Sequence, residues 1–233
     1  MIWLDSNLRQ FRRWSTVAMA GVLALTMTGL VYAKLPVGTV ALYSDGYAQK
    51  LLRYAGNQRI WEDVRKRQYA YDLGSIQVER SVTHPIDPAR SYTAELVQGN
   101  PAVLTKSAQA IDEHFIIRRQ YPFSGREVFR EWSCQGLGSK SVRVVNVKLK
   151  VKAFSCERIK FSRDHVPRVA ETRYIEYAPS LKMVTTMVRT RAGKTKSREL
   201  MFLIPPEQVT AKKIAQLQRQ IQRKRLEQKN EQR

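Results

Sequence analysis

The run from Val145 to Lys152 alternates apolar and polar side chains without a break. This period of two is typical of a β-strand that packs one face on a core and turns the other toward water. The tripeptide Ala192-Gly193-Lys194 predicts a hairpin turn further along the chain. More strands are expected at 127–134, 153–161, 172–177, 181–191 and 198–204. Because the turn signals recur at short intervals, residues 126–204 are predicted to form an antiparallel sheet, curved or partly closed into a barrel.

A β meander is predicted over residues 34–82, where strands at 37–43, 47–54 and 59–64 are separated by the turn signals Asp45-Gly46 and Gly56-Asn57. Residues 83–125 are expected to be a loop and helix connection, and the three prolines and one glycine within 83–101 predict loop and short strand there. Helical spacing predicts a helix over 102–119, although Phe115 to Ile117 would serve equally well in a strand. The fold class is therefore mainly β, with α+β as the alternative.

Residues 1–33 combine a basic start, containing three arginines and one acid, with an uncharged run from Ser15 to Ala33. Together with the small residues Val31 and Ala33, this pattern predicts a secretory signal peptide cleaved after Ala33. The alternative is an uncleaved anchor helix, because 19 residues rise about 28 Å and a bilayer core measures about 30 Å. Both interpretations place residues 34–233 in the periplasm, either free or anchored at the inner membrane.

The chain has two cysteines, Cys134 and Cys156. An even cysteine count outside the cytoplasm favours a disulfide over a free thiol pair. A redox role would be expected from a C-x-x-C spacing, which these two residues do not have. We therefore predict a structural disulfide.

Charge is the feature of this sequence that bears most on partners. Lys and Arg number 41 against 20 Asp and Glu, and residues 34–233 retain 38 against 19, a net charge of +19. A field of this sign attracts polyanions and anionic membrane surfaces. The alternative is that most proteins of the source lineage have a high pI, so that the basic composition says nothing about a partner. We expect an anionic envelope component as partner, and nucleic acid is not expected outside the cytoplasm. The candidate contact residues are Arg65, Lys66, Arg67, Lys148, Lys150, Lys152, Arg219, Arg223, Lys224 and Arg225.

The C-terminal segment, residues 205–233, is predicted to be a basic helix that follows Pro205-Pro206. Ile214, Leu217 and Ile221 form a short apolar stripe on this otherwise charged segment. Three interpretations remain open: a solvated extension, a helix that docks on another protein through the stripe, or a helix on an anionic membrane.

Two groups of motifs resemble a group of secreted proteobacterial β-rich proteins of unknown function. The first is Tyr43-Ser44-Asp45-Gly46 with Trp61-Glu62-Asp63 and Arg65-Lys66-Arg67-Gln68-Tyr69; the second is Trp132-Ser133-Cys134, Cys156-Glu157-Arg158 and Tyr174 to Leu181. The resemblance covers residues 34–204 in patches. It implies a mostly β envelope protein with a bridge between Cys134 and Cys156, and no known chemistry.

Candidate catalytic groups are sparse. The histidines His84, His114 and His165 stand without a motif, and the triplet Asp112-Glu113-His114 is interpreted as a solvated helix face. None of the common nucleophile, zinc or phosphate-loop patterns occurs in the sequence. We therefore expect no catalytic residue, metal or cofactor, and predict a non-enzymatic structural or binding protein of the cell envelope. The alternatives are a membrane-anchored accessory subunit of an envelope complex and an enzyme with an unrecognised site.

Overall fold

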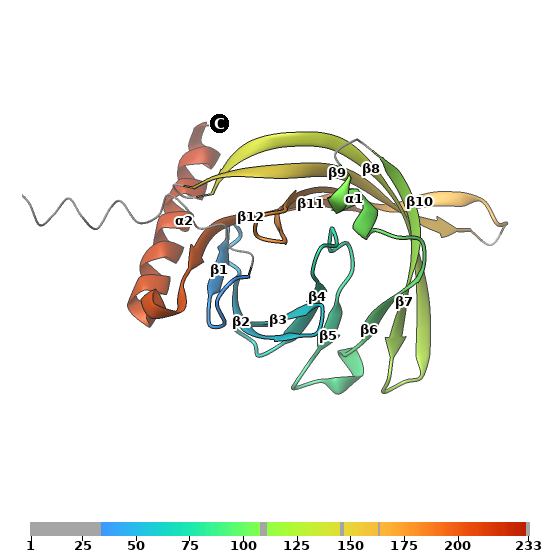
Figure 1. Cartoon of the computed structure of the whole chain (residues 1–233), viewed down its shortest axis with the longest axis horizontal. Helices are drawn as coiled ribbons and strands as arrows, with labels where there is room; N and C mark the ends of the chain where they lie inside the picture. Colours follow the sequence, from blue (N-terminus) through green and yellow to red (C-terminus); the bar gives the residue numbers. More distant parts are fainter. Residues whose placement is uncertain (1–33, 108–110, 145–146, 163, 232–233) are drawn as a thin grey trace, which may run out of the picture. The chain divides into compact units, whose positions relative to one another are not determined.

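The computed structural model describes residues 34–107, 111–144, 147–162 and 164–231. Twelve strands and two α-helices make up this part of the chain (Figure 1). The first six strands are β1 (Val40–Tyr43), β2 (Ala48–Ala55), β3 (Gln58–Asp63), β4 (Gln68–Asp72), β5 (Ser81–Thr83) and β6 (Thr93–Gln98). The other six are β7 (Asp112–Tyr121), β8 (Arg126–Val144), β9 (Val147–Phe161), β10 (Pro167–Ala178), β11 (Met183–Arg191) and β12 (Lys194–Ile204). The helices are α1 (Ala102–Lys106) and α2 (Ala211–Glu231).

All twelve strands belong to one antiparallel sheet, in the order β5-β4-β3-β2-β1-β12-β11-β10-β9-β8-β7-β6. Every ladder of the sheet joins strands that follow each other in sequence, except that β1 pairs with β12, where Val40 lies opposite Ile204. The two outer strands, β5 and β6, meet through a single bridge between Val82 and Tyr92. The sheet therefore curls into a nearly closed barrel, and this confirms the predicted fold class.

The hairpin turns follow from local sequence. Ala192 and Gly193 have φ angles of 49° and 73° between β11 and β12, a backbone that matches the right-handed twist of the paired strands. At the β1–β2 turn, the Asp45 carboxylate accepts a hydrogen bond of 3.1 Å from the Tyr47 backbone N–H, and Gly46 takes a φ of 81°. Both turns were predicted at these positions.

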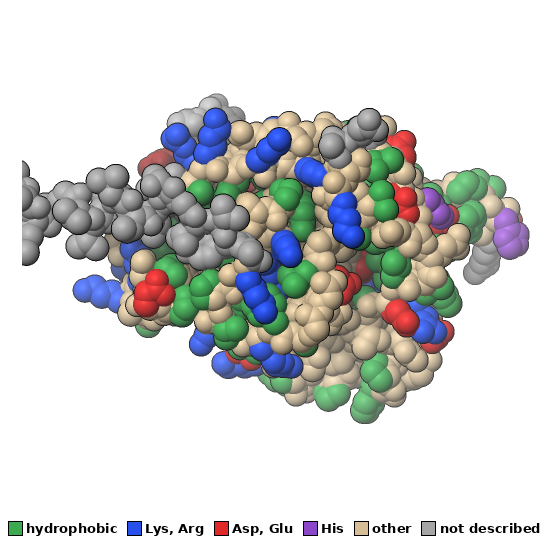
Figure 2. All heavy atoms as spheres, viewed as in Figure 1, with side chains coloured by type: hydrophobic (Ala, Val, Ile, Leu, Met, Phe, Trp, Pro, Cys, Tyr) green, Lys and Arg blue, Asp and Glu red, His purple; other side chains and the backbone are tan. Residues whose placement is uncertain are grey.

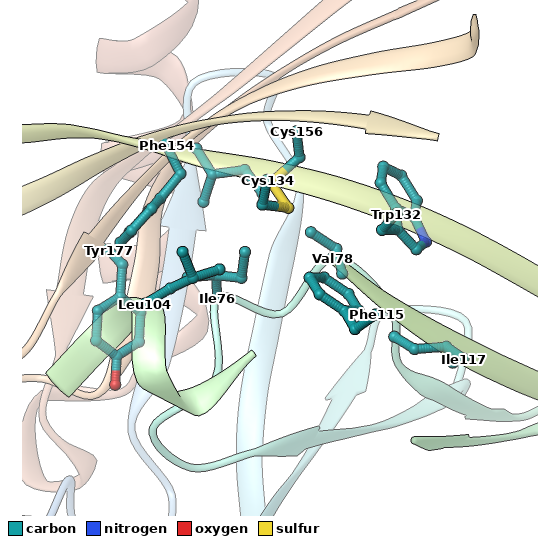
Figure 3. Packing of buried hydrophobic residues seen from close by; sticks show 11 residues of the cluster. Ile76, Val78, Leu104, Phe115, Ile117, Trp132, Cys134, Phe154, Cys156 and Tyr177 are labelled. Carbon is teal, nitrogen blue, oxygen red and sulfur yellow. A yellow bond between two sulfur atoms is a disulfide. The ribbon is translucent and has the colours of Figure 1, made fainter. Parts of the chain in front are cut away.

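The main core lies on the inner face of the barrel wall (Figure 3). Phe115, Trp132, Phe154 and Ile175 are at most 2% exposed and pack together. The disulfide between Cys134 and Cys156 is part of this cluster and joins β8 to β9, where the two cysteines lie directly opposite each other. The structure thus contains the predicted bridge, within the hairpin formed by β8 and β9.

Helix α2 packs on the outer side of the sheet beside β1 and β12 (Figure 1). Leu217 and Ile221 are 7% and 2% exposed and form a second core cluster with Val40, Leu42 and Ile204. Ile214 packs against the same cluster. The apolar stripe, for which docking on another protein was one of three open interpretations, is therefore covered by the sheet of its own chain. Among the described helices, none is long and apolar enough to cross a bilayer.

One secondary-structure prediction is wrong. The expected helix over 102–119 is one short helix, α1, followed by strand β7. The short strand expected within 83–101 is β6, and with β7 it completes the sheet. The apolar spacing arose from the two elements together, and Phe115 and Ile117 face the barrel core as strand residues. The strand expected over 145–152 is confirmed from Val147 onward, where Val147 lies opposite Val144 of β8. Residues 145–146 and the predicted signal or anchor, residues 1–33, lie outside the described part of the chain.

Candidate functional site

A cavity of about 550 Å³ lies inside the barrel. Trp61, Gln49 and Thr185 are 2–3% exposed and line its deep part, while Arg191 and Lys196 line it where the wall is exposed to solvent. A volume of this size is within the range of ligand-binding sites, roughly 300–1,000 Å³. The cavity is therefore large enough for a small molecule or one end of a longer one.

Basic side chains dominate the lining of this cavity, with eight Lys and Arg against the two acids Asp45 and Glu79. The eight are Arg80, Arg119, Arg130, Arg173, Arg189, Arg191, Lys196 and Arg198. We call them the lumen cations. Because like charges in a confined, partly desolvated space repel one another, such a set stabilises an anion that enters it.

The β11–β12 hairpin contributes half of the lumen cations. Arg189 of β11 lies directly opposite Lys196 of β12 in the antiparallel register, and Met187 lies opposite Arg198. Side chains on one strand face the same side at every second residue, which brings Arg191 to the side of Arg189. Within the described residues, Arg191 and Lys196 take part in no ion pair. Like charges directly opposite each other destabilise a sheet. The stability of the sheet therefore does not explain why Arg189 and Lys196 lie opposite each other.

Glu171, on β10, is the internal counter-charge of the cluster. Its fully buried carboxylate lies 2.5 Å from Arg173 Nη2, 3.0 Å from Arg189 Nε and 3.6 Å from Arg158 Nη2. Burial raises the pKa of Glu171, but the charges of Arg173, Arg189 and Arg158 outweigh this effect, and the net result is a lowered pKa. One carboxylate facing three guanidinium groups leaves an excess of positive charge beside the cavity.

Aromatic rings hold several lumen cations in place. The guanidinium carbons of Arg119 and Arg198 lie 4.2 Å and 4.1 Å from the ring centres of Tyr92 and Tyr47, and that of Arg80 lies 4.3 Å from the ring centre of Tyr69. Stacking of this kind is stabilising and fixes the plane of the guanidinium group. A guanidinium that is already oriented loses less rotational freedom when it binds a carboxylate or phosphate.

Burial affects the hydroxyls of two tyrosines that line the cavity, Tyr43 and Tyr92. Burial raises the pKa of Tyr43, which lines the cavity, far above its usual value. Burial has the same effect on Tyr92, where the nearby Arg119 reduces the shift without reversing it. These hydroxyls therefore act as hydrogen-bond donors or acceptors and do not cancel the charge of the arginines.

The predicted contact residues are dispersed over the molecule. Lys148 and Lys150 are exposed on β9, while Leu149 and Val151 between them are buried, as the alternation predicts. Lys152 instead donates to the backbone carbonyls of Thr105 and Ser107, at 2.6 and 2.5 Å, and so holds α1 against the barrel. On the face shown in Figure 2, Lys and Arg side chains lie apart over several elements.

The predicted basic turn between β3 and β4 has mixed roles. Arg65 is exposed, and Lys66 forms an exposed ion pair of 3.1 Å with Glu62. Arg67 is bound to the buried carboxylate of Asp63 at 2.6 Å, so it holds the turn together. On α2, the four predicted residues Arg219, Arg223, Lys224 and Arg225 are exposed. None of the ten predicted contact residues lines the lumen cavity.

The three histidines also lie away from the cavity lining. His114 is on strand β7, not on the helix that we expected, and its Nε2 lies 2.8 Å from Glu131 Oε1 at an exposed position. His84 Nδ1 accepts a hydrogen bond of 2.9 Å from the Asp87 backbone N–H in a loop. His165 adopts a φ of 56° in the β9–β10 turn.

Sequence reasoning missed the lumen cations, although a signal for part of them was present. Arg189, Arg191, Lys194, Lys196 and Arg198 repeat at intervals of two or three residues across a predicted hairpin turn. That spacing puts most of them on one side of the two strands. What the spacing does not reveal is which side faces inward, because basic residues are usually assigned to the outer face.

The chain matches no protein-family model, and comparison with curated proteins gives no match. A comparison with solved structures finds similarity to the crystal structure of the hypothetical lipoprotein YmcC from Escherichia coli. The identity is 11%, the match covers 72% of this chain and 86% of that chain, and the TM-score is 0.40.

Proposed function

We propose that the protein is a non-enzymatic binding protein of the cell envelope whose barrel lumen holds an anionic ligand. The observation that carries this proposal is the ratio of eight basic to two acidic side chains around one cavity of about 550 Å³. Arginines that are stacked on aromatic rings and lie near a buried carboxylate suit planar or tetrahedral oxyanions. The ligand therefore carries a carboxylate or phosphate group.

Export of the protein is the second part of the proposal. It is supported by the uncharged run from Ser15 to Ala33 behind a basic start, and by the disulfide between Cys134 and Cys156. Outside the cytoplasm, ligands with the right chemistry are acidic components of the envelope. We therefore place the anion contact in the lumen and not on the outer basic surface that the sequence analysis proposed.

The test is isothermal titration calorimetry of the full chain with tripolyphosphate and, separately, with citrate. The lumen variant carries Arg191→Gln and Lys196→Gln. The matched control carries Lys148→Gln and Lys150→Gln, which remove the same charge from exposed side chains that do not line the cavity. We expect the lumen variant to bind about tenfold more weakly, because two charge-assisted contacts are lost. The control should bind like the wild type.

Comparison of the two probes separates phosphate from carboxylate recognition. Tighter binding of tripolyphosphate assigns the site to phosphate, and tighter binding of citrate assigns it to carboxylate. Equal losses of affinity in the lumen variant and the control would show that only net charge matters, and would overturn the proposal. Absence of binding of both probes to the wild type would also contradict it.

A further inference from the structure

The segment that joins β4 to β5 runs through the inside of the barrel. Ile76 and Val78 of this segment are 0% and 3% exposed and belong to the main core cluster. Figure 3 shows both side chains among the wall residues Phe115 and Cys134. We call residues 76–80 the strap. A connection between adjacent strands usually passes over the surface, so this strap occupies space that an open barrel would leave to solvent or ligand.

Glu79 of the strap is bound by two of the lumen cations. Its side chain is 1% exposed. Oε2 accepts a hydrogen bond of 2.9 Å from Arg119 Nε and a second one from Arg119 Nη2, and Oε1 accepts one of 3.0 Å from Arg130 Nη1. Two N–H groups of one guanidinium that face one carboxylate are the usual arrangement for binding a carboxylate or phosphate. Glu79 thus fills an anion site that the barrel wall provides.

The strap also separates two cavities. Val78, Glu79 and Arg80 line the cavity of about 550 Å³ and a second one of about 210 Å³. Asp72 of β4 and Leu96 of β6 both line the second cavity. Among the described residues, β5 pairs with β4 only over its three residues and meets β6 through a single bridge, so the wall is thinly connected here. Movement of the strap would join the two cavities.

The contacts of the strap with the rest of the sheet are limited at one end. It leads into β5, which has three residues and reaches β6 through the single bridge between Val82 and Tyr92. Segments with few ladder hydrogen bonds open at lower free energy than the centre of a sheet. The strap is therefore the part of the lumen that can be displaced while β7 to β12 stay paired.

We infer that Glu79 is an internal competitor for the anion site, and that the ligand carries at least two anionic groups. One group takes over Arg119 and Arg130 from Glu79, and another contacts Arg191 and Lys196. A ligand with a single anionic group competes poorly with the Glu79 carboxylate, because the chain holds Glu79 beside Arg119 and Arg130 at a high effective concentration. A second contact on the same ligand supplies the additional affinity. This inference rests on the proposed function.

The experiment measures tripolyphosphate and inorganic phosphate binding to the full-length wild type and to the Glu79→Gln variant by calorimetry. Glutamine keeps the size of the side chain but removes the charge that competes for Arg119 and Arg130. We expect tripolyphosphate to bind the variant about tenfold more tightly, in line with the loss of one charge-assisted interaction that the ligand must break. Inorganic phosphate should bind the variant measurably and the wild type only weakly.

A second variant, Ile76→Ala, leaves Glu79 unchanged and weakens the apolar anchor of the strap. It should also bind tripolyphosphate more tightly, because less packing is lost when the strap leaves. In the wild type, amide hydrogen exchange over residues 76–80 should become faster when tripolyphosphate binds. This readout follows the strap itself and does not depend on how each variant affects stability.

The outcomes separate the two proposals. If the wild type binds tripolyphosphate but both variants bind it equally well or more weakly, the strap is a fixed part of the wall and the inference is wrong. Unchanged or slower exchange at residues 76–80 on binding would also overturn it, while the proposed function would stand. If neither the wild type nor the variants bind tripolyphosphate, inorganic phosphate or citrate, the anion site itself is absent and both proposals fail.

Discussion

Asp63 shows how one buried carboxylate organises a turn made largely of basic residues. It accepts hydrogen bonds from Arg67 Nε at 2.8 Å, from Tyr69 Oη at 3.0 Å and from the backbone N–H of Arg65 at 2.9 Å. Burial raises the pKa of Asp63, but the hydrogen bonds from Arg67 and Tyr69 outweigh it and lower the pKa overall. The basic turn that the sequence marks as a contact surface is therefore built around an acid at its base.

At neutral pH, the free energy of unfolding of the Asp63→Asn variant should be about 2 kcal/mol lower than that of the wild type, because buried hydrogen-bond donors lose a charged acceptor. A carboxylate with a lowered pKa stabilises the fold above the unfolded-state value of about 4, and this contribution is lost as the pH falls through its folded-state pKa. Urea unfolding at pH 7 and near pH 3 tests this. The difference in free energy of unfolding between wild type and variant should become smaller in acid. A difference that stays constant would show that ionisation of Asp63 is irrelevant to stability.

At the scale of secondary-structure elements, the hairpin β8–β9 and the helix α2 stabilise the barrel in different ways. The hairpin is joined across its strands by the disulfide between Cys134 and Cys156, whose sequence separation is 22. Helix α2 contributes apolar side chains that cover the outer side of β1 and β12. These are the two strands that close the sheet between its N-terminal and C-terminal parts, so the helix supports the closure.

Replacement of both cysteines with serine should lower the free energy of unfolding by roughly 3 kcal/mol, as expected for a loop of this length. The measurement is a thermal or urea unfolding curve of the variant beside the oxidised and the reduced wild type. The reduced wild type should resemble the variant. Equal stability of the oxidised and the reduced wild type would mean that the bridge contributes nothing to the fold.

The Ile221→Ala variant should lose about 2–4 kcal/mol of unfolding free energy, because a buried side chain leaves a cavity. The matched control is Leu226→Ala on the same helix, since Leu226 is 63% exposed and its truncation should have little effect. Urea unfolding at neutral pH compares the two. Similar small losses for both variants would indicate that α2 does not pack on the sheet in solution.

The elements predicted correctly are those whose signal is local. Turns such as Asp45-Gly46 and Ala192-Gly193 depend on backbone angles that few residues tolerate, and the alternation around Leu149 depends on one side facing the core. Strand β7 was missed because Val103, Ala110, Ile111 and Phe115 imitate a helical period across a helix and a strand. The lumen cations were missed because inward-facing arginines depend on closure of the whole sheet.

At the scale of the whole molecule, closure of the sheet creates an interior with a chemistry of its own. Contacts between β1 and β12 bring Tyr43 and Asp45 from the start of the described chain beside Arg198 near its end. Strands β7 and β8 supply Arg119 and Arg130 from the opposite part of the sheet. The lumen therefore combines charged residues from Asp45 to Arg198. Only closure of the barrel brings them together around one cavity.

A crystal structure of the full chain with tripolyphosphate would show directly whether the lumen binds anions. We expect one bound anion inside the barrel, with oxygen atoms within hydrogen-bond distance of Arg191, Lys196 or Arg198. An anion found only on α2, or only beside Lys148 and Lys150, would contradict the claim that the lumen is the binding site.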